Sequence, residues 1–162
     1  MTELVLERLP LTLAEFEAMP QMDLRLPQNT AAMFLLAVNA FVQDRKTGRQ
    51  MLDLLRGPAP LSAYEESFLY DRIRYKPYLP LAYFCGAAPG NNYTPALPLT
   101  LQVWPDTRPQ AQPGYIRLFL ATAGADDMRP MTLRQKGENW YLWEYSSILL
   151  GVRPPEKEDP WA

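Results

Sequence analysis

The sequence contains no histidine and only one cysteine, Cys85, among its 162 residues. Histidine is the usual side chain for proton transfer near neutral pH, and it activates the nucleophile in Ser-His-Asp and Cys-His sites. A single cysteine excludes a disulfide within the chain, and without histidine it excludes a zinc site built from these two residue types. The commonest hydrolytic and zinc-dependent sites therefore cannot be built within one chain.

Phosphate-binding glycine motifs and long apolar runs are also missing. Neither G-x-x-x-x-G-K-[ST] nor G-x-G-x-x-G occurs among the eight scattered glycines. The most apolar stretch, residues 31–42, covers about a dozen residues, and a membrane-spanning helix needs about 20. Residues 1–10 are acidic and do not resemble a signal peptide. We therefore expect a cytoplasmic protein that does not span a membrane.

The formal net charge is −2, with acidic residues gathered in 1–23 and 156–159 and a mildly basic middle. This balance does not favour nucleic acid as a partner. Adjacent acidic pairs occur three times, in contexts typical of a helix start, a turn and a tail. We therefore predict no metal site and no cofactor.

Seventeen prolines divide the chain. Because proline cannot donate a backbone hydrogen bond, helices and strands are expected in the proline-free windows 28–57, 61–76, 114–129 and 131–153. Residues 77–113 contain eight of the prolines and are predicted to form a long connection with little helix. Connections of this length are uncommon and often functional.

The first two windows predict three helices. Residues 31–42 are apolar on almost every side, which is typical of a buried central helix, and Asn29 or Thr30 is predicted to cap it. Thr47 is predicted to cap a second helix, which Gly57 ends. Ser62 forms a capping-box pattern with the glutamate three residues later and begins a third helix.

The remaining windows predict strands and, with them, the fold. Alternating apolar residues favour strands at 99–104, 115–122, 131–134 and 140–145, the last two joined as a hairpin. Helices followed by antiparallel strands predict an α+β fold, in which N-terminal helices pack on one face of a curved C-terminal sheet of about four strands. We expect one domain over residues 1–155 and an acidic tail over 156–162.

Several segments resemble a family of small uncharacterised bacterial proteins. The likeness covers most of the chain beyond residue 30 and is carried by residues 129–137 (RPMTLRQKG), 140–147 (WYLWEYSS), 91–95 (NNYTP), 124–126 (GAD) and 158–162 (EDPWA). It implies a bacterial source and no particular activity. More loosely, the closing hairpin resembles the last strands of nuclear-transport-factor-2-like or cystatin-like folds, in which helices lie in the concavity of a bent sheet, often beside a pocket.

Aromatic residues of the last strand could form a binding surface. Trp143 alternates with Leu142 and shares one strand face with Tyr141 and Tyr145. That face could contact a ligand or a partner, or it could be covered by the proline-rich connection. Strand aromatics are common in either setting.

A second candidate lies at the end of the third predicted helix. Arg72, Tyr75 and Tyr78 form a basic and aromatic segment there that could bind an anion. Cations near a helix C-terminus are also favoured by the helix dipole alone. Both interpretations fit the sequence.

The proline-rich connection and the tail supply the remaining candidates. Asn91, Asn92 and Tyr93 could bind a ligand, or they could only form a turn. Trp161 is either docked on its own domain, which we expect, or an anchor for a partner. Cys85 is expected to be a buried, unreactive thiol.

The sequence favours a non-enzymatic binding or protein-interaction module of the bacterial cytoplasm, with a second copy of itself or another protein as partner and an exposed sheet face as the binding surface. The alternative is a small-molecule-binding protein or an enzyme. It would have a pocket between helices and sheet, with polar groups from Arg117, Arg134, Tyr115 or Glu144.

Overall fold

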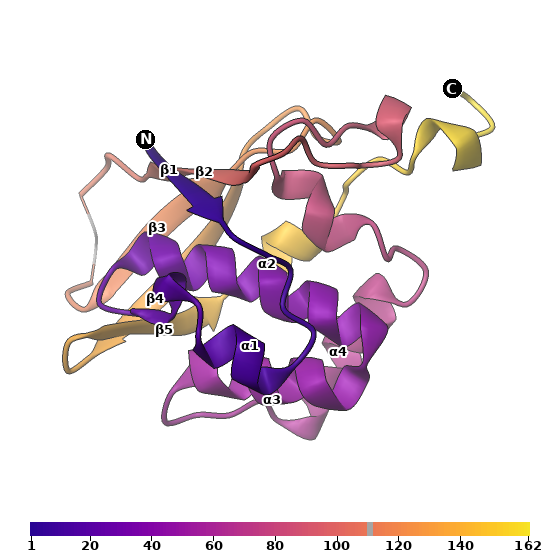
Figure 1. Ribbon diagram of the computed structural model, residues 1–162. Coiled ribbons are helices and arrows are strands. Elements are labelled where there is room, and N and C mark those ends of the chain that lie inside the picture. The colour runs from indigo at the N-terminus through magenta and orange to yellow at the C-terminus, as the bar shows by residue number, and fades with distance from the viewer. Residues whose placement is uncertain (110–111) are drawn as a thin grey trace.

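The computed structural model describes residues 1–109 and 112–162. In these residues the chain forms four α-helices and a curled five-stranded antiparallel sheet of strand order β1-β2-β3-β4-β5. The helices gather on one side of the sheet (Figure 1). The elements are β1 (Thr2–Leu6), α1 (Leu13–Glu17), α2 (Pro27–Gln43), α3 (Arg45–Arg56), α4 (Ala63–Ile73), β2 (Leu99–Pro105), β3 (Tyr115–Leu120), β4 (Arg129–Lys136) and β5 (Asn139–Glu144).

The α+β class is confirmed, but the described sheet has five strands where about four were predicted, and β1 precedes the helices. β1 pairs with β2 along its whole length, from Thr2 opposite Val103 to Leu6 opposite Leu99. Its side chains alternate: Leu4 and Leu6 turn inward, while Val5 is exposed. The alternation of apolar and polar residues in β1 covers only five residues, with acidic residues among and beside them. This pattern is too short to predict a strand from the sequence.

The predicted central helix is confirmed as α2, in which thirteen of 17 residues are buried. The prediction of its cap is wrong, because the helix begins at Pro27. Proline suits the first helical position, since its φ is already helical and its missing N–H would have no helical partner there. Asn29 and Thr30 lie inside the first turns, and their side chains donate hydrogen bonds to the carbonyls of Asp23 and Trp140.

The next two helices begin and end with local signals. The cap of α3 is Asp44, whose carboxylate accepts the N–H of Thr47 at 3.3 Å, so the prediction of Thr47 as the cap is wrong. Gly57 follows α3 at a φ of 62°, as its place before proline predicts. The capping box of Ser62 and Glu65 at the start of α4 is confirmed.

All four predicted strands are present, with ends that differ by one or two residues. The hairpin between β4 and β5 turns at Gly137, which has a φ of 61°. In its described residues, the helical structure of the proline-rich connection is limited to short 3₁₀ turns, at Leu79–Tyr83 and Pro89–Asn91, as its composition predicts, and β2 lies in its second half. The segment that follows β5 forms a further 3₁₀ turn, Ser146–Leu149.

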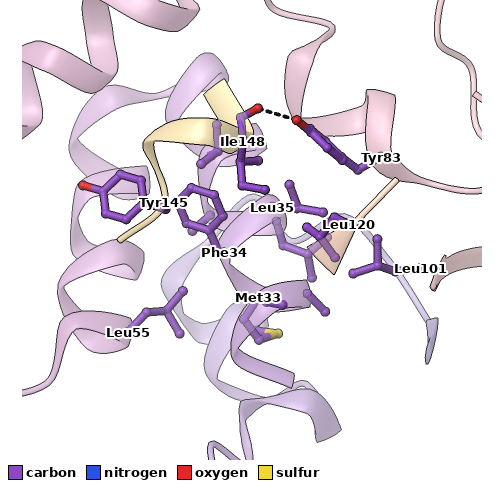
Figure 2. Packing of buried hydrophobic residues seen from close by; sticks show 14 of the residues in the cluster. Met33, Phe34, Leu35, Leu55, Tyr83, Leu101, Leu120, Tyr145 and Ile148 are labelled. Atoms are coloured by element: carbon purple, nitrogen blue, oxygen red, sulfur yellow. Dashed lines mark hydrogen bonds between the residues drawn. The ribbon is translucent and has the colours of Figure 1, made fainter. Parts of the chain in front are cut away.

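The core fills the space between α2 and the sheet. Apolar side chains from α2, α3, β2, β3 and the segment after β5 meet there (Figure 2), including Met33, Phe34, Leu35, Leu55, Leu101, Leu120, Tyr145 and Ile148. The buried hydroxyl of Tyr83 donates a 2.6 Å hydrogen bond to the carbonyl of Ile148. This bond ties the proline-rich connection to the C-terminal part of the domain.

Candidate functional site

The sheet face that is turned away from α2 carries aromatic and cationic side chains. Strand register defines it, because antiparallel partners share a face: Trp104 lies opposite Phe119, and Tyr115 lies opposite Arg134. Alternate residues point to the core, where Leu120 and Leu133 are buried. We call this surface the outer face; its main side chains are Trp104, Tyr115, Arg117, Phe119, Arg134, Tyr141 and Trp143.

A β-bulge in β5 places Trp143 beside Arg134. Leu142 pairs with Leu133 and Glu144 pairs with Thr132, which leaves Trp143 as an extra residue between them. Bulges bend a strand and re-aim a side chain in this way. As a result, the Trp143 side chain lies toward β4 and β3 and remains 45% exposed.

Tyr115, Arg134 and Trp143 form a compact group, which we call the Arg134 cluster. The guanidinium carbon of Arg134 lies 4.7 Å from the centre of the Trp143 ring and 5.4 Å from that of Tyr115. The two rings meet edge to face at 5.7 Å. Stacking of this kind holds the guanidinium in place and leaves its N–H groups available to a carboxylate.

The charge of Arg134 is not neutralised by an ion pair within residues 1–109 and 112–162, and neither is that of Lys136. Arg117 on the same face differs, because Asp106 binds it at 3.0 Å. Hydrogen bonds from Arg108, and then from Arg117, hold the pKa of Asp106 well below its ordinary range. Arg117 is therefore a paired cation, whereas Arg134 and Lys136 can each accept a new anionic partner.

A groove of about 270 Å³ adjoins the Arg134 cluster, between the β4–β5 hairpin and the connection from α3 to α4. We call it the hairpin groove; its walls include Arg56, Pro58, Arg134, Lys136, Tyr141 and Trp143. Gly57 lies against the ring of Tyr141, so closely that a Cβ atom there would be 2.8 Å from it. Arg56 pairs with Glu65 at 2.9 Å and is held inside the fold.

A second hollow, of about 210 Å³, shares Trp143 as a wall with the hairpin groove. The start of α4 contributes Tyr64 and Phe68, and the end of β5 contributes Glu144. The Glu144 carboxylate accepts hydrogen bonds from the backbone and the hydroxyl of Ser146, at 2.8 and 2.6 Å. Trp143 therefore stands between two hollows, with part of its ring open to solvent.

Three of the predicted binding residues, Arg117, Arg134 and Trp143, come together on the outer face. Two of the polar groups predicted for a pocket between helices and sheet do line such a hollow: Arg134 faces the end of α3 in the hairpin groove, and Glu144 faces α4 in the second hollow. Arg117 and Tyr115 lie on the outer face and belong to the lining of neither hollow. The space between α2 and the sheet is filled by the core. Sequence reasoning did not single out Lys136 or Arg56 as groove residues, because nothing in the sequence shows that the α3–α4 connection meets the hairpin.

The predicted anion site at the end of α4 is spread along the helix surface. Arg72 stacks on Phe68, with 4.7 Å between the guanidinium carbon and the ring centre. Tyr75 is exposed, and its hydroxyl accepts a hydrogen bond from Arg74. The anion role of Arg72 and Tyr75 stays a prediction.

The third predicted group lies beside the chain's last residues. The Asn91 side chain bonds four backbone groups of its own turn, and Asn92 has a left-handed φ of 58°. Tyr93 is buried, stacks on Tyr78 with ring centres 5.2 Å apart, and donates its hydroxyl to the carbonyl of Arg153 at 2.6 Å. Turn formation and packing account for these contacts.

Trp161 is 93% exposed, so the prediction that it docks on its own domain is wrong. The 3₁₀ turn Glu156–Glu158 still contacts the Pro89–Asn91 turn, but the chain then leaves the surface before Trp161. Cys85 is half-buried where burial was predicted. Burial raises the pKa of its thiol, which favours the unreactive protonated form.

Within residues 1–109 and 112–162, no group of three or more acidic or cysteine side chains is placed to hold a metal ion. In the same residues, no helix has the length and apolar character needed to cross a membrane. The Arg134 cluster and the hairpin groove bring unpaired positive charge and exposed aromatic rings together, and they form the candidate site.

Comparison with known proteins gives a family and no assigned activity. No curated protein and no solved structure matches the chain. The likeness to nuclear-transport-factor-2-like and cystatin-like folds stays a prediction. A family model described as Domain of unknown function (DUF6935) matches residues 8–156, which confirms the resemblance to an uncharacterised family, and the chain belongs to that family.

Proposed function

We propose that this domain is a non-enzymatic binding module that recognises another protein chain through the Arg134 cluster and the hairpin groove. The observation that carries the proposal is that Arg134 stacks against the rings of Tyr115 and the half-exposed Trp143 and forms no ion pair with a carboxylate among the described residues. Tryptophan, tyrosine and arginine dominate the binding energy of protein interfaces. Their gathering on one sheet face, with Arg134 and Trp143 exposed, supports this role.

The chemistry of the cluster indicates what the partner carries. A stacked guanidinium presents its N–H groups in one plane, which matches the two oxygens of a carboxylate. Lys136 adds a second positive charge to the same groove. Trp143 and Tyr141 offer ring faces for an apolar or aromatic side chain. A protein segment with carboxylates next to an aromatic residue satisfies both features.

The size of the groove is compatible with one side chain of a peptide segment. Small-molecule sites usually enclose about 300–1,000 Å³ and bury most of the ligand. The hairpin groove, at about 270 Å³, lies just below that range. It has room for one large side chain with its neighbours resting on the outer face. We further propose that the protein is bacterial and that it acts in the cytoplasm, as the sequence predicts.

Titration with designed peptides tests this function. A short glutamate-rich peptide with one tryptophan is added to isotope-labelled protein, and a matched peptide has lysine in place of glutamate. We expect the acidic peptide to shift the NMR signals of the Trp143 indole N–H and of the Arg134 side chain, and the basic peptide to leave them unchanged.

Variants make the test specific. Arg134→Glu is expected to weaken binding of the acidic peptide by roughly tenfold or more, because a hot-spot arginine contributes at least that much. Lys46→Glu makes the same change of charge at an exposed position in α3 and is expected to bind like the wild type. Equal binding by both variants, or shifts confined to another surface, would contradict the proposal.

A further inference from the structure

We infer that residues 156–161, which we call the acidic segment, dock in the hairpin groove of a second copy of the chain, so that two copies exchange segments. This inference rests on the proposed function and names its partner. The acidic segment contains Glu156, Glu158 and Asp159 against a single lysine, and it ends in the exposed Trp161.

Each side of this contact lacks a partner within its own chain. In residues 1–109 and 112–162, no ion pair includes a carboxylate of the acidic segment. The same holds for Arg134 and Lys136 in the groove, as described above. Carboxylates with an exposed tryptophan on one surface therefore match cations with exposed aromatic rings on another.

The chain's own fold keeps the two sites apart. Arg153 is fixed by Tyr93 and by the Gly124 carbonyl, and Glu156–Glu158 rest on the Pro89–Asn91 turn. The acidic segment therefore projects from one side of the molecule, while the β4–β5 hairpin lies on the opposite side (Figure 1). A contact between acidic segment and hairpin groove has to come from another molecule.

Symmetry then favours a closed pair. Every copy has one acidic segment and one groove, so two copies can make the same contact twice around a two-fold axis. The second contact forms within the pair and adds to the strength of the first. Each exchange buries one Trp161, a side chain with about 150–250 Å² of surface, next to Trp143 and Tyr141.

Sedimentation of the full chain over a wide concentration range tests the exchange. We expect a monomer–dimer equilibrium, and Trp161→Ala is expected to move the midpoint to a concentration roughly tenfold higher or more. Tyr75→Ala removes another exposed aromatic ring and is expected to dimerise like the wild type. A wild type that stays monomeric, or a W161A variant that dimerises normally, would overturn the inference.

A charge exchange identifies the two surfaces. A groove-reversed variant carries Arg134→Glu with Lys136→Glu, and a segment-reversed variant carries Glu156→Lys with Glu158→Lys. Each variant alone sets like charges against each other and is expected to be monomeric. Mixed together, the two variants are complementary at both contacts and are expected to form a one-to-one dimer. Absence of that mixed dimer counts against the acidic segment as the occupant.

The outcomes also separate this inference from the proposed function. If the protein is monomeric but the glutamate-rich peptide still shifts the Trp143 signal, the groove binds a different protein and only the self-exchange fails. If neither association nor peptide binding occurs, both proposals fail. Because all substituted side chains are exposed, thermal unfolding of each variant, measured at a concentration where the wild type is monomeric, is expected to match that of the wild type.

Discussion

The pKa of the Tyr145 hydroxyl is set mainly by the burial of this side chain. Its ring lies in the core against Phe34, with 5.0 Å between the ring centres. Burial raises the pKa of Tyr145 to about 12. Arg56 opposes this effect, and Glu65 and Glu144 add to it. Ionising this hydroxyl inside the fold is therefore costly.

Stability is expected to fall at alkaline pH in consequence. Tyrosine in the unfolded chain has a pKa near the ordinary value of 10.0, and the folded value is higher. The contribution of Tyr145 is thus complete below pH 10 and is lost as pH rises from 10 to about 12. Urea unfolding of wild type and Tyr145→Phe across this range measures it. The same pH dependence in both proteins would contradict the assignment.

Residue identities alone predict only part of the site. Arg117, Arg134 and Trp143 were all candidates from their strand positions, and all three lie on the outer face. The sequence cannot show that Asp106 neutralises Arg117 while Arg134 stacks on rings, because these contacts depend on strand register. It also cannot show whether Trp161 is covered, since no pattern fixes where a short terminal segment goes.

Among the elements, α2 and α3 make a close backbone contact at Gly48. A Cβ atom at this position would lie 2.2 Å from the Cα of Phe41. Only glycine allows two helix backbones to come so near. The contact holds α3 in position, and α3 in turn leads into the Gly57 corner that borders the hairpin groove.

Gly48→Ala is expected to destabilise the protein by about 1–3 kcal/mol, because the added methyl group forces the two helices apart. At an exposed position in the middle of a helix, replacing glycine with alanine stabilises a protein by roughly 0.5–1 kcal/mol. The sign of the change in the free energy of unfolding therefore tells whether the close contact exists. Gln50→Ala, at an exposed position of α3, is the matched control. Chemical unfolding of the three proteins gives the comparison, and a stabilised Gly48→Ala protein would exclude the close contact.

Elements with strong local signals were predicted well, and the rest depended on distant contacts. The capping box of Ser62 and the turn at Gly57 are local, and both are confirmed. Because α2 begins at Pro27, Asn29 and Thr30 lie inside the helix and do not cap it. β1 could not be predicted, because a five-residue strand is defined by its pairing with β2. The bulge at Trp143 likewise arises between two strands.

At the scale of the whole molecule, β1 joins the first residues to the middle of the chain. Leu6 is 2% exposed and packs in the core, whereas its neighbour Val5 is 54% exposed on the other face. Leu6→Ala is expected to cost roughly 2–5 kcal/mol, and Val5→Ala less than about 0.5 kcal/mol. Equal unfolding midpoints for the two variants would show that β1 is not anchored as described.

The pairing of β1 with β2 also dictates an order of events during synthesis. β1 leaves the ribosome long before β2, so it has no strand to pair with while α2, α3 and α4 emerge and can already associate locally. Bringing β1 and β2 together closes the long stretch of chain between them. This step is slow, because the chain loses conformational entropy before the strand pairing can stabilise it. The helices are therefore expected to fold first, and β1, one of the two edge strands, is expected to join the sheet as a late step.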